Sequence, residues 1–237
     1  MSIKQTKPGD FDVRYSKSIK PGKIFEVYQD RNCLYTKNLT PGKTFFVERT
    51  VTQDNTEYRE WDPRRSKLAA AILKGCTNTF IRKGSIVLYL GAAHGYTPSF
   101  ISDIIGNDGF IFALDNSSRV VRDLVFLAKE RENIAPILAD ANHPETYIKK
   151  IPQVDIIYQD IAQRNQAEIF LKNSELFLKP GGYALIAVKA RSIDITQKPK
   201  KLFNEVRILL DKKMKVIDFR ILDPFERDHC FIIAKKT

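Results

Sequence analysis

The fold is decided by residues 86–97, which read Ile86-Val87-Leu88-Tyr89-Leu90-Gly91-Ala92-Ala93-His94-Gly95-Tyr96-Thr97. An apolar, partly β-branched run of this length is typical of a buried strand, and small residues follow it before a helical pattern begins. Gly91 and Gly95 would let the backbone approach a bound molecule closely, and the next helix offers free N–H donors at its start. The stretch therefore predicts the first strand and ligand loop of an open α/β sheet. An ordinary strand-to-helix turn is the alternative, because the dinucleotide pattern G-x-G-x-x-G is absent.

Length and composition indicate a globular protein. With 237 residues and 43% hydrophobic content, the chain can bury one sizeable core and carry a small additional module. No apolar run approaches the roughly 18 residues that span a bilayer, and Met1–Asp10 lacks the apolar centre of a secretory signal. Cys33, Cys76 and Cys230 are widely scattered, so they form neither a disulfide framework nor a Cys-x-x-Cys metal site. We expect a cytoplasmic protein that needs no metal.

The charge balance favours a polyanionic partner. The chain has 39 Lys and Arg against 28 Asp and Glu, a net charge of +11, which attracts nucleic acid where the charge is clustered. The densest clusters are Arg64-Arg65-Ser66-Lys67, Lys189-Ala190-Arg191 and Lys198-Pro199-Lys200-Lys201. A solvated surface is the alternative interpretation of each cluster.

The chain divides unevenly into two predicted domains, residues 1–56 and 57–237. In the first, polar and apolar residues alternate over Lys23–Tyr28 and Lys43–Val51, and Pro-Gly pairs at Pro21-Gly22 and Pro41-Gly42 mark turns. This pattern predicts a small antiparallel β domain.

From Tyr58 onward the pattern alternates between strands and helices, which is typical of a mainly parallel sheet. Pro63 suits the first turn of a helix that ends near Gly75 and buries Leu68, Ala69 and Ile72. Seven strands are predicted, the last two joined as a hairpin: Ile86–Leu90, Phe110–Leu114, Ile134–Leu138, Val154–Tyr158, Tyr183–Val188, Val216–Leu222 and His229–Ala234. The expected architecture is the Rossmann-like sheet of a class I methyltransferase.

Ligands of an open α/β sheet bind beyond the carboxyl ends of its strands, so the residues that follow each strand indicate the chemistry. Asp115 follows the second strand, where a carboxylate can accept both hydroxyls of a ribose. Asp140-Ala141 follows the third, where a carboxylate can accept an adenine amino group. The loop at Gly91 lacks both the Walker lysine pattern and the dinucleotide glycines, which favours S-adenosylmethionine as the nucleoside cofactor. Each acid is alternatively a simple helix cap.

Asp160 and Lys189 end neighbouring strands, so their carboxylate and ammonium could approach each other at the mouth of the cleft. Lys67 and His229 are the other titratable candidates. Two lysines close together bind protons less tightly, while a carboxylate opposes that effect and holds one amine in place. The group could thus take a proton from an alcohol. A structural salt bridge and a satisfied buried histidine are the alternatives.

Four segments carry a family resemblance. They are Tyr58-Arg59-Glu60-Trp61-Asp62-Pro63-Arg64-Arg65-Ser66-Lys67-Leu68-Ala69-Ala70-Ala71-Ile72, Val87-Leu88-Tyr89-Leu90-Gly91-Ala92-Ala93, Gln159-Asp160-Ile161-Ala162-Gln163 and Val188-Lys189-Ala190-Arg191-Ser192-Ile193-Asp194. In this order they resemble fibrillarin, an RNA 2′-O-methyltransferase. The glycine- and arginine-rich tail of eukaryotic members is missing, which points to the archaeal type.

The resemblance implies site residues at matching positions. The family's catalytic Lys-Asp-Lys-His set falls on Lys67, Asp160, Lys189 and His229. Cofactor contacts fall on Gly91, Ala92, Ala93, Gly95, Tyr96, Thr97, Asp115, Asn116, Asp140, Ala141, Asp160 and Gln163. Arg64, Arg65 and Arg191 would hold the target RNA.

Two departures from the family pattern lie within that cofactor set. This chain has Gly95-Tyr96-Thr97 where the family usually has Gly-Thr-Thr, and Asp115-Asn116 where it has Glu-Phe. Asp shortens the ribose acceptor by one methylene, and Asn removes an aromatic surface beside the adenine. Weaker cofactor binding is the resulting hypothesis, unless Tyr96 or another ring compensates.

The predicted function is in-line transfer of a methyl group from S-adenosylmethionine to ribose 2′-hydroxyls of rRNA or tRNA. Lys189 would be general base or electrostatic activator, Asp160 would orient it, and no metal would take part. The chain has no RNA-recognition motif. The resemblance implies that target choice comes from a box C/D guide RNA, assembled with a Nop-type scaffold protein and a kink-turn-binding ribosomal-like protein. A methyltransferase acting alone on a small molecule and a non-catalytic RNA-binding scaffold remain the alternatives.

Overall fold

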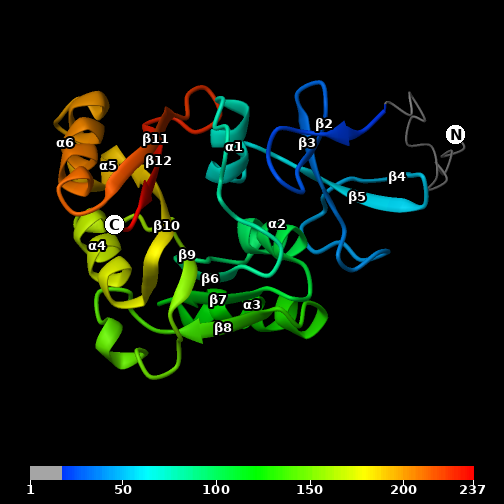
Figure 1. Cartoon of the computed structure of the whole chain (residues 1–237), viewed down its shortest axis with the longest axis horizontal. Coiled ribbons are helices and arrows are strands. Elements are labelled where there is room, and N and C mark those ends of the chain that lie inside the picture. Colours follow the sequence, from blue (N-terminus) through cyan, green and yellow to red (C-terminus); the bar gives the residue numbers. More distant parts are fainter. Residues whose placement is uncertain (1–17) are drawn as a thin grey trace, which may run out of the picture.

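The computed structural model describes residues 18–237, and the predicted polar stretch Met1–Asp10 lies outside the described residues. The described residues contain a five-stranded and a seven-stranded sheet, which occupy different ends of the molecule (Figure 1). None of the helices within residues 18–237 is long and apolar enough to cross a membrane.

The small sheet is antiparallel throughout, with strand order β1-β2-β3-β5-β4. Its strands are β1 (Lys20–Pro21), β2 (Tyr28–Asp30), β3 (Cys33–Lys37), β4 (Thr50–Gln53) and β5 (Thr56–Trp61). The sheet was predicted correctly, but the prediction of strands over residues 23–28 and 43–51 was wrong, since only Tyr28 and residues 50–51 of these stretches are in strands. The cause is packing: Ile24, Val27, Phe45 and Phe46 contact the core of the larger unit instead of alternating across the small sheet.

Strand β5 crosses the predicted domain boundary after residue 56. It pairs with β3 on one side and β4 on the other along its length, so residues 57–61 belong to the small sheet. The division of the chain into two domains stays a prediction, but the small sheet itself extends to Trp61.

Helix α1 (Lys67–Leu73) begins four residues later than predicted. Pro63 lies in a turn, in which the N–H of Arg65 donates to the carbonyl of Asp62 at 3.1 Å and the N–H of Arg64 donates to the Asp62 carboxylate at 2.9 Å. Ser66 then caps the helix, accepting from the N–H of Ala69 at 3.4 Å. The cap, and not the proline, therefore fixes the start of the helix and places Lys67 in its first turn.

The large sheet has strand order β11-β12-β10-β9-β6-β7-β8. Strand β12 runs antiparallel to both of its neighbours, and the other six strands of this sheet all point the opposite way. The strands are β6 (Ile86–Leu90), β7 (Phe110–Asp115), β8 (Ile134–Leu138), β9 (Val154–Gln159), β10 (Leu178–Lys189), β11 (Lys215–Ile221) and β12 (His229–Lys235). All seven predicted strands and the terminal hairpin are confirmed, as is the predicted class I methyltransferase architecture.

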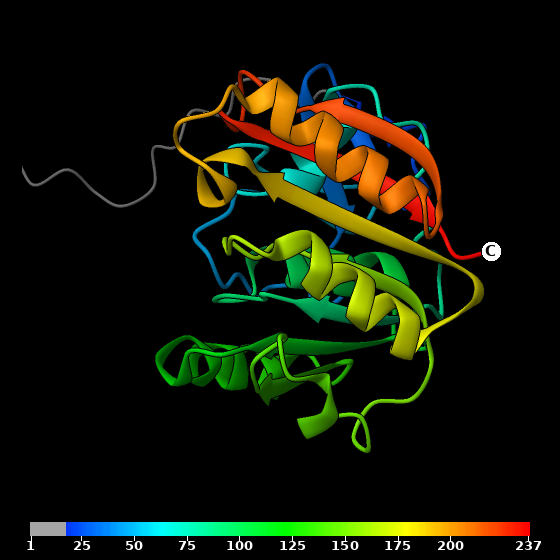
Figure 2. The ribbon, with the colours of Figure 1, turned by 90° about the vertical axis from the view of Figure 1, so that its left-hand side faces the viewer.

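Helices cover both faces of this sheet. Besides α1, they are α2 (Tyr96–Ile105), α3 (Ser118–Glu130), the short 3-10 helix η1 (Pro144–Thr146), α4 (Gln166–Phe177), α5 (Ala190–Ile193) and α6 (Pro199–Asp211). Alternate residues of β6 face opposite ways: Val87 and Tyr89 pack in one core with α1, α2 and α3, whereas Leu88 and Leu90 pack in a second core with α4 and α6. Figure 2 shows α4 and α6 lying across one face of the strands.

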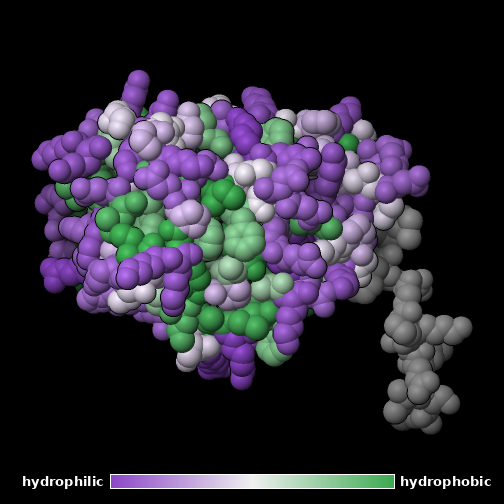
Figure 3. Space-filling model, turned by 60° about the horizontal axis from the view of Figure 1, so that its bottom comes forward, coloured by the Kyte–Doolittle hydropathy of each residue, from purple (hydrophilic) through white to green (hydrophobic). Residues whose placement is uncertain are grey.

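The edge strand β8 is less protected than the rest of the sheet. Leu138 at its end is 56% exposed, and Phe126 on neighbouring α3 is 57% exposed. Figure 3 shows apolar side chains interleaved with polar ones on the underside of the molecule. Pro136 removes one backbone donor from β8, a feature that limits further pairing at a sheet edge.

A buried ionic cluster joins the small sheet to the large unit. Arg59 of β5 is fully buried and pairs with Asp103 of α2 at 2.8 Å and with Glu48 at 2.6 Å. Asp103 also pairs with Arg131 at 2.7 Å and accepts from the hydroxyl of Thr36 at 2.7 Å. Because every charge in the cluster has a partner, it can be buried without an isolated ion.

We predict that Arg59→Met destabilises the protein by about 3 to 5 kcal/mol, because it leaves the buried carboxylate of Glu48 without its guanidinium and removes one of the two guanidinium partners of Asp103. Urea unfolding would measure the loss. Lys83→Met is the matched control, since the Lys83–Asp108 pair is exposed (68% and 70%) and such pairs contribute about 0 to 1 kcal/mol. Equal losses in the two variants would contradict the prediction.

Candidate active site

The predicted site residues meet at one edge of the large sheet. Strands β6, β7, β9 and β10 are parallel, so their carboxyl ends lie on the same side. Strand β12 is antiparallel to β10, which brings its first residue, His229, to that side too, directly opposite Lys189 in the register. The topology therefore gathers residues from the whole length of the chain.

A cavity of about 260 Å³ lies at this edge. Most of the predicted cofactor-binding residues line it, namely Gly91, Ala93, Asp115, Asn116, Asp140, Ala141, Asp160 and Gln163. These residues lie at the ends of four different strands. They are far apart in the sequence and come together only in the folded protein.

Gly91 makes close approach to β9 possible. Its φ is +80°, and a Cβ atom there would collide with the carbonyl oxygen of Asp160 and lie 2.9 Å from Cγ1 of Ile161. A side chain at this position would therefore be strained by the backbone and also push into the cavity wall.

Asp115 holds the loop that follows β6. Its two carboxylate oxygens accept from the N–H of Ala93 and of Ser117, each at 3.0 Å. Each oxygen of an ionised carboxylate has a further acceptor site. Asp115 can therefore receive hydroxyl groups of a ligand while it keeps the loop in place.

Asp140 is similarly fixed on the far side of the same cavity. Its Oδ1 accepts from the backbone N–H of Asn142 at 2.9 Å and from the Asn142 side chain at 3.0 Å. The backbone hydrogen bond is the main cause that lowers the pKa of Asp140. The Asn142 amide also donates to Oε1 of Gln163 at 2.8 Å, which links two predicted cofactor residues.

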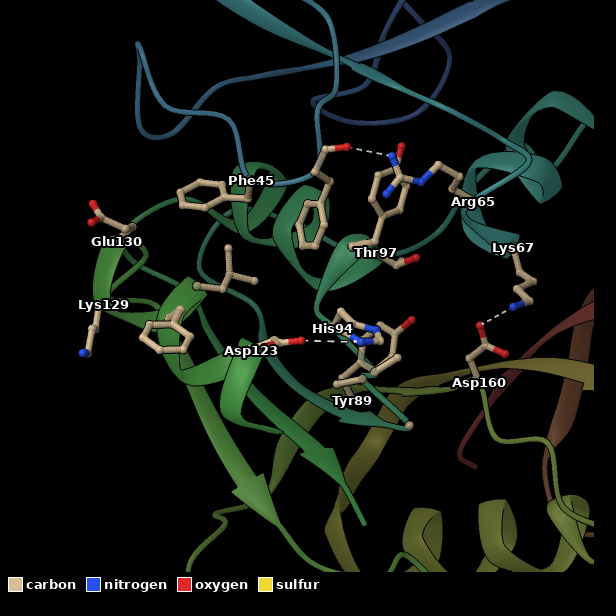
Figure 4. A pocket seen from close by; sticks show the side chains of 17 residues that line it. Phe45, Arg65, Lys67, Tyr89, His94, Thr97, Asp123, Lys129, Glu130 and Asp160 are labelled. Atoms are coloured by element: carbon tan, nitrogen blue, oxygen red, sulfur yellow. Dashed lines mark hydrogen bonds and ion pairs between the residues drawn. The ribbon is translucent and has the colours of Figure 1, made fainter. Parts of the chain in front are cut away.

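A larger cavity of about 770 Å³ adjoins the first (Figure 4). Gly91, Ala93 and Asp160 line both cavities, so the two meet at this loop. Ala92, Tyr96 and Thr97 line only the larger one. Gly95 lines neither: it has φ +91° at the start of α2, where a Cβ atom would lie 2.8 Å from Leu124 of α3.

Tyr96 belongs to the wall between the small sheet and α2. Its hydroxyl accepts from the N–H of Asp62 at 3.1 Å, the Arg65 guanidinium lies 4.2 Å above its ring, and Phe46 packs on it edge-on at 5.3 Å. The ring lines the larger cavity, whereas Asn116 lines the smaller. Tyr96 thus does not replace the aromatic surface that is absent at Asn116.

Lys67 and Asp160 form an ion pair of 3.0 Å at the junction of the cavities (Figure 4). Burial alone would lower the pKa of Lys67, but the charge and hydrogen bond of Asp160 and the charge of Glu226 together outweigh it. The pKa of Lys67 is therefore raised, and its amine is held as a cation.

The carboxylate of Asp160 pairs with Lys67, which enters from α1, and not with Lys189. Lys189 has an exposed side chain on a fixed backbone. Its N–H donates to the side chain of Gln166 at 3.0 Å, and its carbonyl accepts from the same side chain at 3.2 Å. Its ammonium takes no part in the ion pair between Asp160 and Lys67.

His229 is buried, and its Nδ1–H donates to the carbonyl of Arg227 at 2.7 Å. This bond leaves Nε2 as the acceptor of the neutral ring. Oε2 of Glu226 lies 4.0 Å from Nδ1. The sequence analysis missed Glu226, and its position three residues before His229 was the available signal.

The three arginines predicted to hold RNA differ in their surroundings. Arg65 donates to the carbonyl of Phe46 at 2.9 Å besides covering Tyr96. Arg191 pairs with Asp228 at 3.0 Å. Arg64 is exposed. Within residues 18–237, no group of three His, Cys, Asp or Glu residues is placed to hold a metal ion.

The strand order and the cavity at the strand ends define a methyltransferase of the class I, S-adenosylmethionine-dependent type. The fibrillarin family model matches residues 16–237, and the chain belongs to the fibrillarin family.

Three known proteins illustrate the similarity. The chain is 48% identical over 192 residues to the fibrillarin-like rRNA/tRNA 2′-O-methyltransferase of Pyrococcus horikoshii, covering 81% of this chain and 85% of the relative. The structure of Aeropyrum pernix fibrillarin with natively bound S-adenosyl-L-methionine superimposes with a TM-score of 0.83, at 42% identity over 92% of this chain and 97% of that one. A fibrillarin in complex with Nop5p gives a TM-score of 0.82, at 42% identity over 90% and 99%.

We predict that Gly91→Ala lowers the melting temperature more than Gly42→Ala does. Both glycines have φ +80°, but no atom lies within 4 Å of a Cβ built at Gly42. The left-handed conformation costs roughly 1 to 2 kcal/mol in either variant, so the difference isolates the collision with Asp160 and Ile161. Thermal unfolding would measure it, and identical melting temperatures would show that the loop yields without cost.

Proposed function

We propose that this protein transfers the methyl group of S-adenosylmethionine to ribose 2′-hydroxyls of rRNA and tRNA. The observation that carries the proposal is the junction of two cavities at Gly91 and Asp160, with the cation of Lys67 at that junction. The relatives named rRNA/tRNA 2′-O-methyltransferase and the fibrillarin that binds S-adenosyl-L-methionine support it.

The smaller cavity fits the nucleoside part of the cofactor. Asp115 would accept the ribose hydroxyls and Asp140 the adenine amino group, since both carboxylates are held in place by backbone N–H groups. The rest of the cofactor would continue past Gly91 toward Lys67 and Asp160. When bound, S-adenosylmethionine supplies an activated methyl group on a sulfonium.

The residues of the chain then have to align the ribose hydroxyl and receive its proton. Lys189 is the proposed base or electrostatic activator, because its amine is exposed and does not share the carboxylate of Asp160. Lys67 is the fixed cation that stabilises negative charge on the hydroxyl oxygen. His229 would support the edge of the site through its Nε2.

Target choice would come from an assembled particle. A fibrillarin of similar structure occurs in a complex with Nop5p, which supports a Nop-type scaffold as a partner here. A box C/D guide RNA and a kink-turn-binding ribosomal-like protein complete the proposed particle. Arg64 remains a proposed RNA contact. Arg65 and Arg191 are proposed to contact RNA as well, through the guanidinium N–H groups that do not bind Phe46 or Asp228.

We place the reaction in the cytoplasm as part of the proposal. Cys33, Cys76 and Cys230 are all free thiols, which fits a reducing compartment.

Methyl transfer to a target RNA tests the proposal. The chain is incubated with labelled S-adenosylmethionine and RNA, with and without guide RNA, scaffold and kink-turn protein, and the modified ribose is mapped. We expect one 2′-O-methylated nucleotide that depends on the guide. Transfer to small molecules without RNA would favour the stand-alone enzyme, and RNA binding without transfer would favour the scaffold.

In this assay we predict that Lys189→Ala lowers transfer by at least about 100-fold, the usual effect of losing a general base. Cofactor affinity should stay within about twofold by calorimetry, because Lys189 does not line the smaller cavity. Lys150→Ala, which removes an exposed lysine after η1, is the control and should behave as the parent. Substantial transfer by Lys189→Ala would refute the assigned role.

We also predict that Asn116→Phe tightens S-adenosylmethionine binding. Asn116 lines the smaller cavity and Tyr96 does not, so a phenyl ring would add a stacking surface worth about 1 to 3 kcal/mol. Calorimetric titration of both proteins measures the dissociation constants. Equal constants would mean that the adenine does not lie against this residue.

A further inference from the structure

Two buried glutamines join the strand ends that carry Asp160 and Lys189. Gln159 is the last residue of β9 and Gln166 is the first residue of α4, and both are fully buried. The side-chain amide of Gln159 donates to the backbone carbonyl of Gln166 at 2.6 Å. The start of α4 is therefore fastened to the strand whose next residue is Asp160.

The side-chain amide of Gln166 makes two hydrogen bonds to the backbone of Lys189. Its Oε1 accepts from the N–H at 3.0 Å, and its Nε2 donates to the carbonyl at 3.2 Å. The pairing of β10 with β9 ends at Ile186 and Gln159, three residues before Lys189. The amide of Gln166 thus continues the hydrogen bonding of β10 beyond the end of β9.

The same amide closes the loop that carries Asp160 and Gln163. Nε2 of Gln166 donates its second hydrogen to the carbonyl of Gln163 at 2.9 Å. Asp160 and Gln163 line the smaller cavity, where the cofactor is proposed to bind. One side chain therefore links the loop at this cavity to the end of the strand that carries Lys189.

A primary amide suits these three partners, because it combines one acceptor oxygen with two donor hydrogens. Here it meets one N–H and two carbonyls, so both donors are used. The reversed amide would set its NH2 group against the Lys189 N–H and its oxygen against two carbonyls, which fixes the orientation of the side chain. A side chain of similar size without donors would leave both carbonyls unpaired.

We propose that Gln166 is a positioning residue for methyl transfer, which holds the backbone of Lys189 at a fixed place relative to the cofactor loop. This inference rests on the proposed function, in which Lys189 is the base or electrostatic activator. The side chain of Lys189 is exposed, so its backbone is the part that neighbouring residues hold. A displacement of about 1 Å can cost about 100-fold in rate. Gln166 can therefore control transfer although it lines neither cavity.

Gln53 of β4 offers a matched control. Its Oε1 accepts from the N–H of Ile19 at 2.8 Å, and its Nε2 donates to the carbonyl of Ile19 at 3.1 Å. The contact is again a glutamine amide on the backbone of one residue, but it belongs to the small sheet. Gln53→Met thus removes equivalent hydrogen bonds away from the strand ends of the large sheet.

The first measurement is amide hydrogen exchange of the full chain by NMR, which needs no catalysis. Gln166→Met should speed exchange of the Lys189 N–H by about tenfold, the effect of losing one hydrogen bond. The neighbouring N–H of Ala190 donates to the carbonyl of Asp228 at 3.0 Å and should change less. Gln53→Met should leave both rates as in the parent. Unchanged exchange at Lys189 in Gln166→Met would overturn the inference.

The second measurement is single-turnover methyl transfer in the guide particle, with S-adenosylmethionine and RNA at saturation so that affinity does not enter. Gln166→Met should transfer about 10- to 100-fold more slowly, and Gln53→Met should match the parent. In a Lys189→Ala background, Gln166→Met should have little further effect, because it acts through Lys189. A merely structural role would slow transfer equally in both backgrounds, and that result would overturn the inference.

Gln166→Asn serves as the second variant if Gln166→Met does not fold. It keeps the amide but is one methylene shorter, so it cannot bind Lys189 and Gln163 together. We expect faster exchange at Lys189 and slower transfer, and parent values for either would contradict the proposed role. A parent that transfers no methyl group to RNA would overturn the proposed function, and the inference with it. With an active parent, the other outcomes concern Gln166 alone.

Discussion

The position of the small sheet depends on one carboxylate, that of Asp103 in α2. It binds Arg59 from β5, Arg131 from the end of α3 and Thr36 from β3, all in the interior. Arg59 also pairs with Glu48, whose Oε2 accepts from the N–H of Phe46 at 2.8 Å. The charge network therefore helps to fix the segment of Phe45 and Phe46, which lines the larger cavity.

Periodicity predicted the large sheet well because its strands are covered on both faces. Each residue of β6 meets one of two cores, and such strands are continuous apolar runs in the sequence. The same signal failed for residues 23–28 and 43–51, where apolar residues pack on the other unit. Pro63 misled the prediction of α1, since the hydrogen bonds of Asp62 and Ser66 decide where the helix begins.

The site could be predicted as a set of residues but not as a set of contacts. Parallel strand ends meet at one edge, so Asp115, Asp140 and Asp160 were predictable from their places after strands. The partner of Asp160 was not, because the direction in which α1 carries Lys67 depends on the tertiary packing of that helix. Tyr96 likewise contacts Asp62, Arg65 and Phe46, which are distant in sequence, and no local pattern reports such contacts.

Asp160 borders both cavities and also pairs with the cation of Lys67, which lines the larger one. A single carboxylate in this position couples the two compartments thermodynamically. A ligand that changes the charge or packing around Asp160 from one side alters the free energy of binding on the other, and the coupling is equal in both directions. In the proposed reaction, binding of the methyl donor would therefore change the affinity for the acceptor ribose, and the reverse, before any bond is made or broken.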